Sequence, residues 1–306
     1  MKSATSSAPR LSPAIPLIIG MVAISFAPIL VRFSDAPVSV QGMYRMLFTI
    51  LVMLPFGAKQ AGAARRISGK DWLLLGLAGF FLALHFLLWM ASLTYTSIAS
   101  STIILSLEPV LVMIGAYFAF KERSSRRALL GMLLAILGVV TVGSGDSGGS
   151  GDALLGDLLS FLGTLAIVAN MLIAKRLMSR IPSYLYSLIA FAITFLCFAL
   201  YNLATGTPMF DYPAREWLLF VLLAVVPTVL GHMIFNWLLQ HVKATTISMT
   251  VLAEPVGASI LGIFLFGEYL GAAQLAGGAC VIVGLILYMR SEQNGAAQET
   301  PEALAG

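Results

Sequence analysis

Ten runs of apolar residues, each near the length that a helix needs to cross a bilayer, occupy most of the 306-residue chain. Hydrophobic residues fill 59% of the positions and charged residues only 10%, with a mean hydropathy of +0.93. Water-soluble domains are far more polar than this. A bilayer core of roughly 30 Å takes about 20 apolar residues per helix. The sequence therefore predicts an all-α integral membrane protein with ten spans and no separate soluble domain.

The predicted spans are separated by short polar turns. They lie at residues 14–33, 37–57, 72–94, 97–120, 128–142, 153–174, 183–203, 216–240, 244–266 and 272–289. Residues 1–13 and 291–306 are polar tails, and the second is expected to be disordered because it is rich in Ala, Glu and Gln. The first run is followed by charged residues rather than a cleavage site, so we expect it to be retained as a span.

The basic residues predict an orientation. If the N-terminus is cytoplasmic, all of the 18 Lys and Arg residues face the cytoplasm except Arg32, Arg45 and Arg215. This asymmetry follows the positive-inside rule, and it places both termini in the cytoplasm of a bacterial-type inner membrane. Because the basic residues lie in turns rather than on one amphipathic face, a nucleic-acid partner is not expected. Cys197 and Cys280 lie in apolar runs without a CxxC or His/Cys cluster, so we expect no metal and no cofactor.

The chain contains an internal repeat. Residues 254–284 repeat the pattern of residues 108–138, including a Glu-Pro pair, a second Glu fourteen positions later and two glycines. Unrelated apolar helices share Ile and Phe by chance, but they rarely share such a polar pattern. We therefore predict two homologous halves, 14–142 and 153–289.

An odd number of spans in each half requires the second copy to enter the membrane in the opposite orientation. The connecting turns agree with this inversion. The basic turn 121–127 corresponds to 267–273, which contains neither Lys nor Arg. The predicted architecture is therefore two inverted five-helix repeats, which is typical of secondary transporters, although some channels are also inverted duplications.

These residues resemble the drug/metabolite transporter superfamily, specifically its EamA-type members with ten spans. The resemblance rests on the sequence 107–110 (Leu-Glu-Pro-Val), on 120–123 (Phe-Lys-Glu-Arg), and on the echo of both at 253–256 and 266–268. Tyr44-Arg45 also resembles the arginine that the family carries in its second span. The resemblance implies export, or less often uptake, of small metabolites such as amino acids and their analogues, and some members export drugs. The first span of each half lacks the family's usual aromatic residue, so the resemblance does not name a substrate.

Two glutamates are candidate transport residues. Glu108 and Glu254 lie inside predicted spans, where an isolated carboxylate costs at least ~2.5 kcal/mol in lipid and is expected to face the bundle interior. Pro109 and Pro255 lack an N–H and predict a helix break beside each carboxylate. The site would suit an ammonium group or a proton, so it permits proton antiport and equally permits facilitated diffusion. Alternatively, each Glu bonds a neighbouring helix and serves only packing.

Arg45 is the single Lys or Arg in the interior of a predicted span, because Arg32 lies at the end of the first span. It is expected to bind either a substrate carboxylate or, as a structural alternative, Glu108 or Glu254.

Polar and aromatic residues recur in the third span of each half. His85 and Trp89 are one helical turn apart, and His232, Asn236 and Trp237 cluster in the corresponding span. They predict an aromatic cavity wall with a few convergent polar groups. A Trp near a helix end is alternatively an anchor at the membrane interface.

Tyr44 is a further candidate for binding, with Tyr95, Asn170, Thr246 and Thr250 as weaker ones, because hydroxyls within spans usually bond their own helix backbone.

The glycines at 131, 138, 277 and 284 predict close helix packing in spans five and ten, within one chain or at a homodimer contact.

The function we predict is a secondary transporter for small organic metabolites, working in the lipid bilayer by alternating access. A multidrug or cationic-compound exporter is the nearest alternative, and a channel or an integral-membrane enzyme is the alternative of another class. An enzyme is not expected, because the chain has no HExxH, P-loop or acidic metal cluster.

Overall fold

The computed structural model describes residues 13–57, 61–96, 98–143, 153–254, 256–257, 260–261 and 271–302. All regular secondary structure in these ranges is helical. The helices of the first half are α1 (Ala14–Ile24), α2 (Ala27–Phe33), α3 (Val38–Gly57), α4 (Ala61–Ala64), α5 (Gly69–Tyr95), α6 (Ile98–Leu105), α7 (Glu108–Phe120) and α8 (Arg126–Gly143). Those of the second half are α9 (Ala153–Leu177), α10 (Ser183–Thr205), α11 (Ala214–Leu223), the π-helix η2 (Ala224–Met233), α12 (Ile234–Leu238), α13 (Ala244–Val251) and α15 (Ala272–Glu302).

Seven segments of the described residues are long and apolar enough to cross a membrane. They are Ala14–Phe33, Val38–Phe56, Gly69–Tyr95, Ala153–Leu177, Ser183–Thr205, Ala214–Leu238 and Leu275–Glu292. The predicted span 97–120 is divided between α6 and α7, and α7 is a shorter apolar helix. Much of the predicted span 244–266 lies outside the described residues. The chain is thus a multi-pass helical membrane protein, and the count of ten spans stays a prediction.

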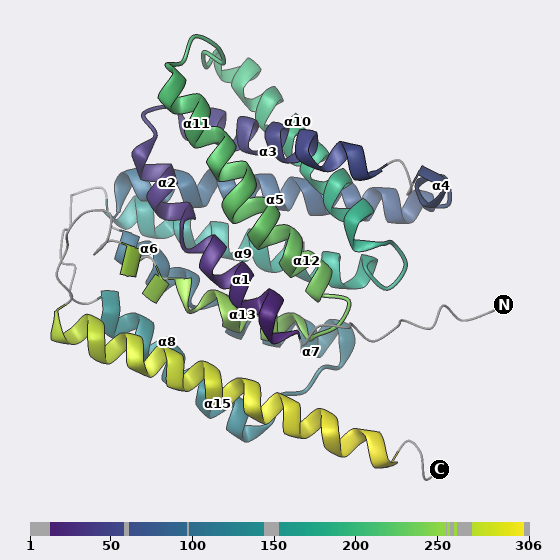
Figure 1. Cartoon of the computed structure of the whole chain (residues 1–306), viewed down its shortest axis with the longest axis vertical. Helices are drawn as coiled ribbons and strands as arrows, with labels where there is room; N and C mark the ends of the chain where they lie inside the picture. The colour runs from purple at the N-terminus through teal and green to yellow at the C-terminus, as the bar shows by residue number, and fades with distance from the viewer. Residues whose placement is uncertain are drawn as a thin grey trace.

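The helices pack most extensively in seven pairs (Figure 1). They are α5 with α9, α5 with α10, α3 with α10, α1 with η2, α7 with α9, α7 with α13, and α8 with α15. The last pair forms the lower edge of the bundle in Figure 1. Many of the exposed side chains along the helices are large and apolar, as contact with lipid requires.

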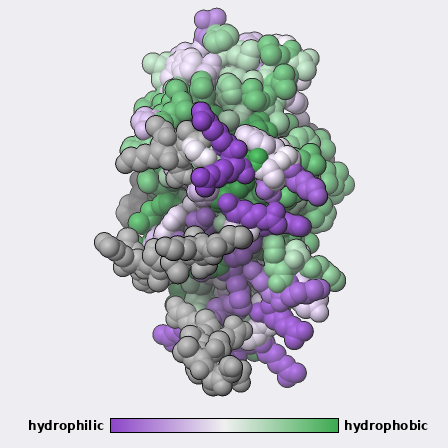
Figure 2. Space-filling model, turned by 90° about the vertical axis from the view of Figure 1, so that its right-hand side faces the viewer, coloured by the Kyte–Doolittle hydropathy of each residue, from purple (hydrophilic) through white to green (hydrophobic). Residues whose placement is uncertain are grey.

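One end of the bundle is polar. Figure 2 shows the side of the molecule that carries α4 and the two chain ends in Figure 1, and hydrophilic residues gather there. Arg65, Arg66, Lys121, Arg123 and Arg126 are exposed on the turns around α4, α7 and α8. We refer to this side as the α4 end.

The pair α8 and α15 crosses at its glycines. A Cβ atom at Gly131 would lie 2.7 Å from the carbonyl oxygen of Gly284, and one at Gly138 would lie 2.6 Å from that of Gly277. The earlier glycine of α8 meets the later glycine of α15, and the later glycine of α8 meets the earlier one of α15. The two helices therefore run antiparallel. All four glycines are buried between helices of a single chain, so their close approach needs no second copy.

Gly131→Ala is expected to lower the free energy of unfolding by about 1–3 kcal/mol, the usual cost of overpacking. The obstacles are backbone atoms of Gly284 and Tyr288, both 2.7 Å from the added Cβ, which cannot turn aside. Thermal unfolding in detergent measures the change. Gly76→Ala on α5 is the matched control, because no atom lies within 4 Å of a Cβ there. Equal melting temperatures for the two variants would contradict the close crossing.

The prediction of a disordered tail from Ser291 is wrong for residues 291–302, which continue α15. Two contacts hold the start of this extension. Ser125 and Ser291 share a hydrogen bond of 2.5 Å between their hydroxyl oxygens, and Lys243 Nζ lies 2.7 Å from Glu292 Oε2. Ala, Glu and Gln are also strong helix formers, so an anchored segment of this composition extends as a helix.

Candidate functional site

Several helices are interrupted near the middle of the bundle. α1 ends at Ile24, and α2 resumes at Ala27 with Pro28 in its first turn. α6 ends at Leu105, and α7 begins at Glu108 with Pro109 in its first turn. The proline ring fits the first turn of a helix but cannot donate to the carbonyl of the preceding turn, so the chain breaks there.

The second half also departs from regular α-helix at two places, and the first of them, before Glu254, matches the break before Glu108. α13 ends at Val251, and two short turns at Leu252 and Ala253 precede Glu254. Pro255, the predicted cause of this break, lies outside the described residues. The π-helix η2 surrounds Pro227 and lets the hydroxyl of Thr228 donate to the carbonyl of Leu223 at 2.8 Å.

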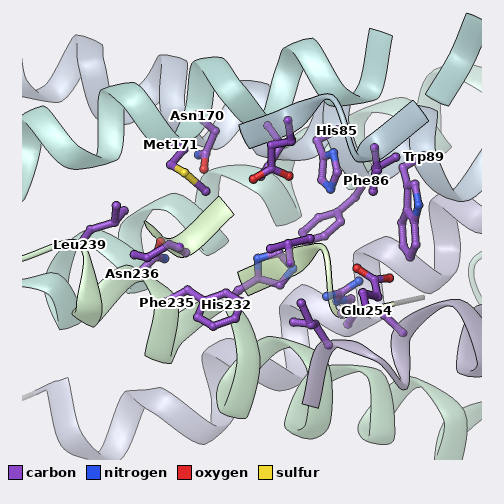
Figure 3. Close-up of a pocket in the computed structure, with 18 residues that line it drawn as sticks. His85, Phe86, Trp89, Asn170, Met171, His232, Phe235, Asn236, Leu239 and Glu254 are labelled. Carbon is purple, nitrogen blue, oxygen red and sulfur yellow. The ribbon is translucent and has the colours of Figure 1, made fainter. Parts of the chain in front are cut away.

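A cavity of about 70 Å³ lies where these interruptions meet (Figure 3). It is lined by Ile24, Ala27, Arg45, His85, Phe86, Trp89, Leu105, Glu108, Ile167, Asn170, Met171, His232, Phe235, Asn236, Leu239, Ile247, Val251 and Glu254. We call it the central pocket. Both halves of the chain contribute to its wall, and eight of the predicted binding residues line it. These are Arg45, His85, Trp89, Glu108, Asn170, His232, Asn236 and Glu254.

Arg45 is fully buried. Its Nε–H donates to Thr228 Oγ1 at 2.6 Å, and its guanidinium carbon lies 4.2 Å from the centre of the Phe86 ring. Its Nη1 and Nη2 atoms have no hydrogen-bond partner among the described residues. No ion pair within 4.0 Å joins Arg45 to Glu108 or Glu254, all three of which the structure describes. This conformation therefore contains no direct ion pair between Arg45 and a glutamate, although Glu254 interacts electrostatically with Arg45.

His85 and Trp89 stack with ring centres 6.2 Å apart and an angle of 9° between their planes. The Nδ1–H of His85 donates to the carbonyl of Gly163 at 2.9 Å, which fixes the tautomer and the ring orientation. The edge of His232 meets Phe86 at a centre distance of 5.2 Å. The aromatic wall predicted for the third span of each half thus comes together around Phe86.

The two glutamates in the wall come from different halves. Glu108 is 3% exposed and Glu254 is 6% exposed. Oε1 of Glu108 has no hydrogen-bond partner among the described residues. Two buried carboxylates and one buried guanidinium therefore face a common small cavity, an arrangement that costs desolvation energy unless a ligand or water compensates it.

The amides in the wall are held by neighbouring helices. Nδ2 of Asn170 donates to the carbonyl of Ala78 at 2.8 Å, and Nδ2 of Asn236 donates to Ser187 Oγ at 3.1 Å. The hydroxyl of Thr250 donates to the carbonyl of Thr246 at 2.9 Å, so it bonds its own helix. These groups chiefly position the wall.

Tyr44 and Trp237 lie outside the central pocket. The hydroxyl of Tyr44 donates to the carbonyl of Met209 at 2.7 Å, and its ring stacks on Phe220 at 5.1 Å. Trp237 packs edge-on against His241 at 4.7 Å. Each is the chain neighbour of a pocket residue, and neighbouring helical residues point about 100° apart.

Phe86 and Thr228 were not predicted, yet they support Arg45 from two sides. Their positions in the sequence could have indicated this role. Phe86 directly follows His85, and Thr228 follows Pro227 and precedes His232 by four residues.

The two ends of the pocket differ. At the α4 end, Lys175 Nζ donates to the carbonyls of Leu239 at 3.0 Å and Val242 at 2.6 Å. At the opposite end, a separate hollow of about 870 Å³ opens between α2, α3, α5, α9 and α10. Leu88 and Met90 line this hollow while Trp89 lines the central pocket, so α5 forms part of the wall between them.

Glu122→Gln is expected to raise the melting temperature at pH 8 but not at pH 4. Burial raises the pKa of the Glu122 carboxyl above its ordinary value, although Lys175 and Lys243 oppose this. Because the pKa is raised in the folded state, the contribution of this carboxyl to the free energy of unfolding is fully present below the ordinary pKa. It is lost as the pH rises through the raised pKa. Thermal unfolding at both pH values tests this, and a Gln variant less stable at pH 8 than the original chain would contradict it.

Comparisons with known proteins agree with this description. The sequence profile of the EamA-like transporter family matches residues 11–144 and again residues 154–290. An uncharacterized transporter of Archaeoglobus fulgidus is 28% identical over 80% of this chain and 84% of the relative. The uncharacterized transporter YetK of Bacillus subtilis is 29% identical over 78% of this chain and 73% of the relative.

A third relative, from Salmonella typhimurium, is named "Probable amino-acid metabolite efflux pump". It is 26% identical over 61% of this chain and 66% of the relative. One solved structure, titled "Crystal structure of protein", superposes with a TM-score of 0.76 over 93% of this chain and all of the other, at 16% identity, and it supports the fold alone. The family resemblance seen in the sequence is confirmed, and the protein is a transporter rather than an enzyme. By its two matched segments, the chain belongs to the EamA-like transporter family.

Proposed function

We propose that the protein is a secondary carrier that exports small organic metabolites, amino acids or their analogues, across the cytoplasmic membrane by alternating access. The observation that carries the proposal is the central pocket, which both halves line with buried charged and aromatic groups at the breaks of their helices. Discontinuous helices around a midplane site are characteristic of secondary transporters.

The proposed architecture is ten spans in two inverted halves with both termini in the cytoplasm. The antiparallel crossing of α8 and α15 supports the inversion, because these helices occupy equivalent positions in the two repeats. The helix pairs support it too. α5, in the third span of the first half, packs on α9, the first span of the second half. η2, in the third span of the second half, packs on α1, in the first span of the first half, so the two contacts are equivalent.

The size of the pocket supports a moving carrier. A cavity of about 70 Å³ holds a few water molecules, whereas sites for small organic ligands usually measure about 300–1,000 Å³. Solute binding must therefore move the pocket's walls apart. The contacts at each end would then open in turn: the Lys175 contacts toward the cytoplasm and the α5 wall toward the large hollow.

The Salmonella relative named as a probable amino-acid metabolite efflux pump supports the substrate class. Glu108 and Glu254 also favour cationic solutes, so a cationic-compound exporter is the second candidate. The same carboxylates could carry a coupling proton, and a homodimer is compatible with the exposed lipid-facing helices.

Counterflow in proteoliposomes tests the proposal. Vesicles loaded with an unlabelled L-amino acid should accumulate the same labelled solute transiently, with a saturable initial rate. Protein-free vesicles are the control, and cationic drugs added outside test the second candidate by competition. Flux that never saturates would indicate a channel, and no flux for any solute of the panel would refute the carrier.

A further inference from the structure

Three buried hydrogen-bond donors in the central pocket lack partners among the described residues. They are Nη1 and Nη2 of Arg45, which is fully buried, and Nε1 of Trp89, which is 4% exposed. Buried donors without partners are rare in folded proteins, and a cluster of them around a cavity points to an absent acceptor.

The guanidinium of Arg45 is held in one orientation. Thr228 donates its hydroxyl to the carbonyl of Leu223 and so presents a lone pair to the Nε–H of Arg45 at 2.6 Å. Phe86 covers one face of the guanidinium at 4.2 Å. With Nε and one face occupied, the edge that carries Nη1 and Nη2 remains for a ligand. Two parallel N–H groups on a planar edge match the two oxygens of a carboxylate.

Trp89 is also held in place. Its ring stacks on His85, whose Nδ1–H is bonded to the carbonyl of Gly163. Figure 3 shows the rings of Trp89 and His85 side by side in the pocket wall. The indole N–H can only donate, so it adds a third donor for an acceptor in the pocket.

Glu108 supplies the opposite charge. It lines the same pocket, is 3% exposed, and its Oε1 has no partner among the described residues. A buried carboxylate oxygen of this kind accepts hydrogen bonds from an ammonium group.

We infer that Arg45 and Trp89 form a carboxylate subsite and that Glu108 receives an ammonium group, so the pocket selects zwitterionic α-amino acids over cations that lack a carboxylate. This inference rests on the proposed function and specifies how its substrate is recognised. An amine leaves the three donors unpaired. An amino-acid amide offers one carbonyl oxygen instead of two carboxylate oxygens, carries no negative charge and turns an NH₂ donor toward the guanidinium edge. A site built for carboxylate bonds rejects ligands that cannot make them.

Binding to the purified protein in detergent tests the inference separately from transport. The probes are L-leucine and L-phenylalanine, each with its amide and its decarboxylated amine, and binding is read as ligand-induced thermal stabilisation. We expect each amide and amine to bind at least tenfold more weakly than its amino acid. Equal binding of amides and amino acids, or no binding of either amino acid, would overturn the inference.

Trp89→Phe isolates the indole donor because it keeps the aromatic ring. We expect L-leucine to bind about three- to tenfold more weakly to this variant, with no change for its decarboxylated amine. Trp237→Phe, outside the pocket, is the matched control and should bind as the original chain does. An equal loss for L-leucine and its decarboxylated amine would overturn the role of Trp89. Should Trp89→Phe fail to fold, the ligand panel on the original chain decides alone.

Binding and transport measurements separate failure of the carboxylate subsite from failure of the carrier. If the amino acids bind selectively but show no counterflow, the recognition stands and the carrier fails. If counterflow proceeds but amides compete as well as amino acids, the carrier stands and the carboxylate subsite fails.

Discussion

Arg45→Ala is expected to lower the initial rate of amino-acid counterflow by about 30-fold or more, while the yield of folded protein stays near normal. Truncating one partner of a buried charged pair costs about 2–5 kcal/mol, and each 1.4 kcal/mol is a factor of ten. Arg45 has two donor atoms without a hydrogen-bond partner among the described residues, and Glu254, which attracts it electrostatically, forms no ion pair with it within 4.0 Å, so we expect the solute to be their partner. The rate is measured in proteoliposomes at matched protein content.

Arg45→Lys separates charge from shape. Lysine keeps the positive charge but lacks the planar edge, so its rate should fall between those of the original chain and Arg45→Ala. Phe118→Leu, on a side chain 71% exposed on the lipid-facing surface, should leave the rate within about twofold. A rate for Arg45→Ala within twofold of the original would remove Arg45 from the binding site.

Glu254→Gln is expected to reduce counterflow by about tenfold or more. The carboxylate is 6% exposed in the wall supplied by the second half, and a carboxylate within the membrane costs at least ~2.5 kcal/mol, so packing alone does not explain it. Glutamine keeps the shape and cannot ionise. Counterflow and folded yield are both measured, so that lost activity is not mistaken for lost protein.

Asp211→Asn is the control for Glu254→Gln. Asp211 is an exposed carboxylate that lines neither the central pocket nor the large hollow, so the rate of this variant should stay within about twofold of the original. Unchanged counterflow in Glu254→Gln would favour the alternative in which this glutamate serves only packing.

Much of the fold follows from patterns visible in the sequence. The low charge and the long apolar runs predict membrane helices, and the repeated Glu-Pro pattern predicts two halves. The antiparallel crossing of α8 and α15 at their glycines agrees with the inverted repeat. The π-helix around Pro227 was not predicted, because a proline within an apolar run signals a disturbance without specifying its form. The helical extension to Glu302 was missed because it depends on the contacts of Ser291 and Glu292 with distant segments.

The site could be predicted in part. Arg45, Glu108 and Glu254 are ionisable groups inside spans, and the cost of burying them placed them correctly in the interior. Tyr44 and Trp237 lie outside the central pocket although their chain neighbours line it. Position next to a polar residue in the sequence does not tell which side of the helix a side chain faces. Phe86 and Thr228 look like ordinary span residues, and only the folded chain shows that they hold Arg45.

We propose that the two halves are inverted relative to one another around a shared pocket. Arg126 and Ala272 are exposed at the starts of α8 and α15, at equivalent positions of the two repeats. In a chain whose two natural cysteines are replaced, a single cysteine at either position can be labelled with a membrane-impermeant maleimide in intact cells and in inverted vesicles. We predict that Arg126→Cys reacts only in inverted vesicles and Ala272→Cys only in intact cells. Reaction of both from the same side would contradict the inverted architecture and, with it, the carrier that we derive from it.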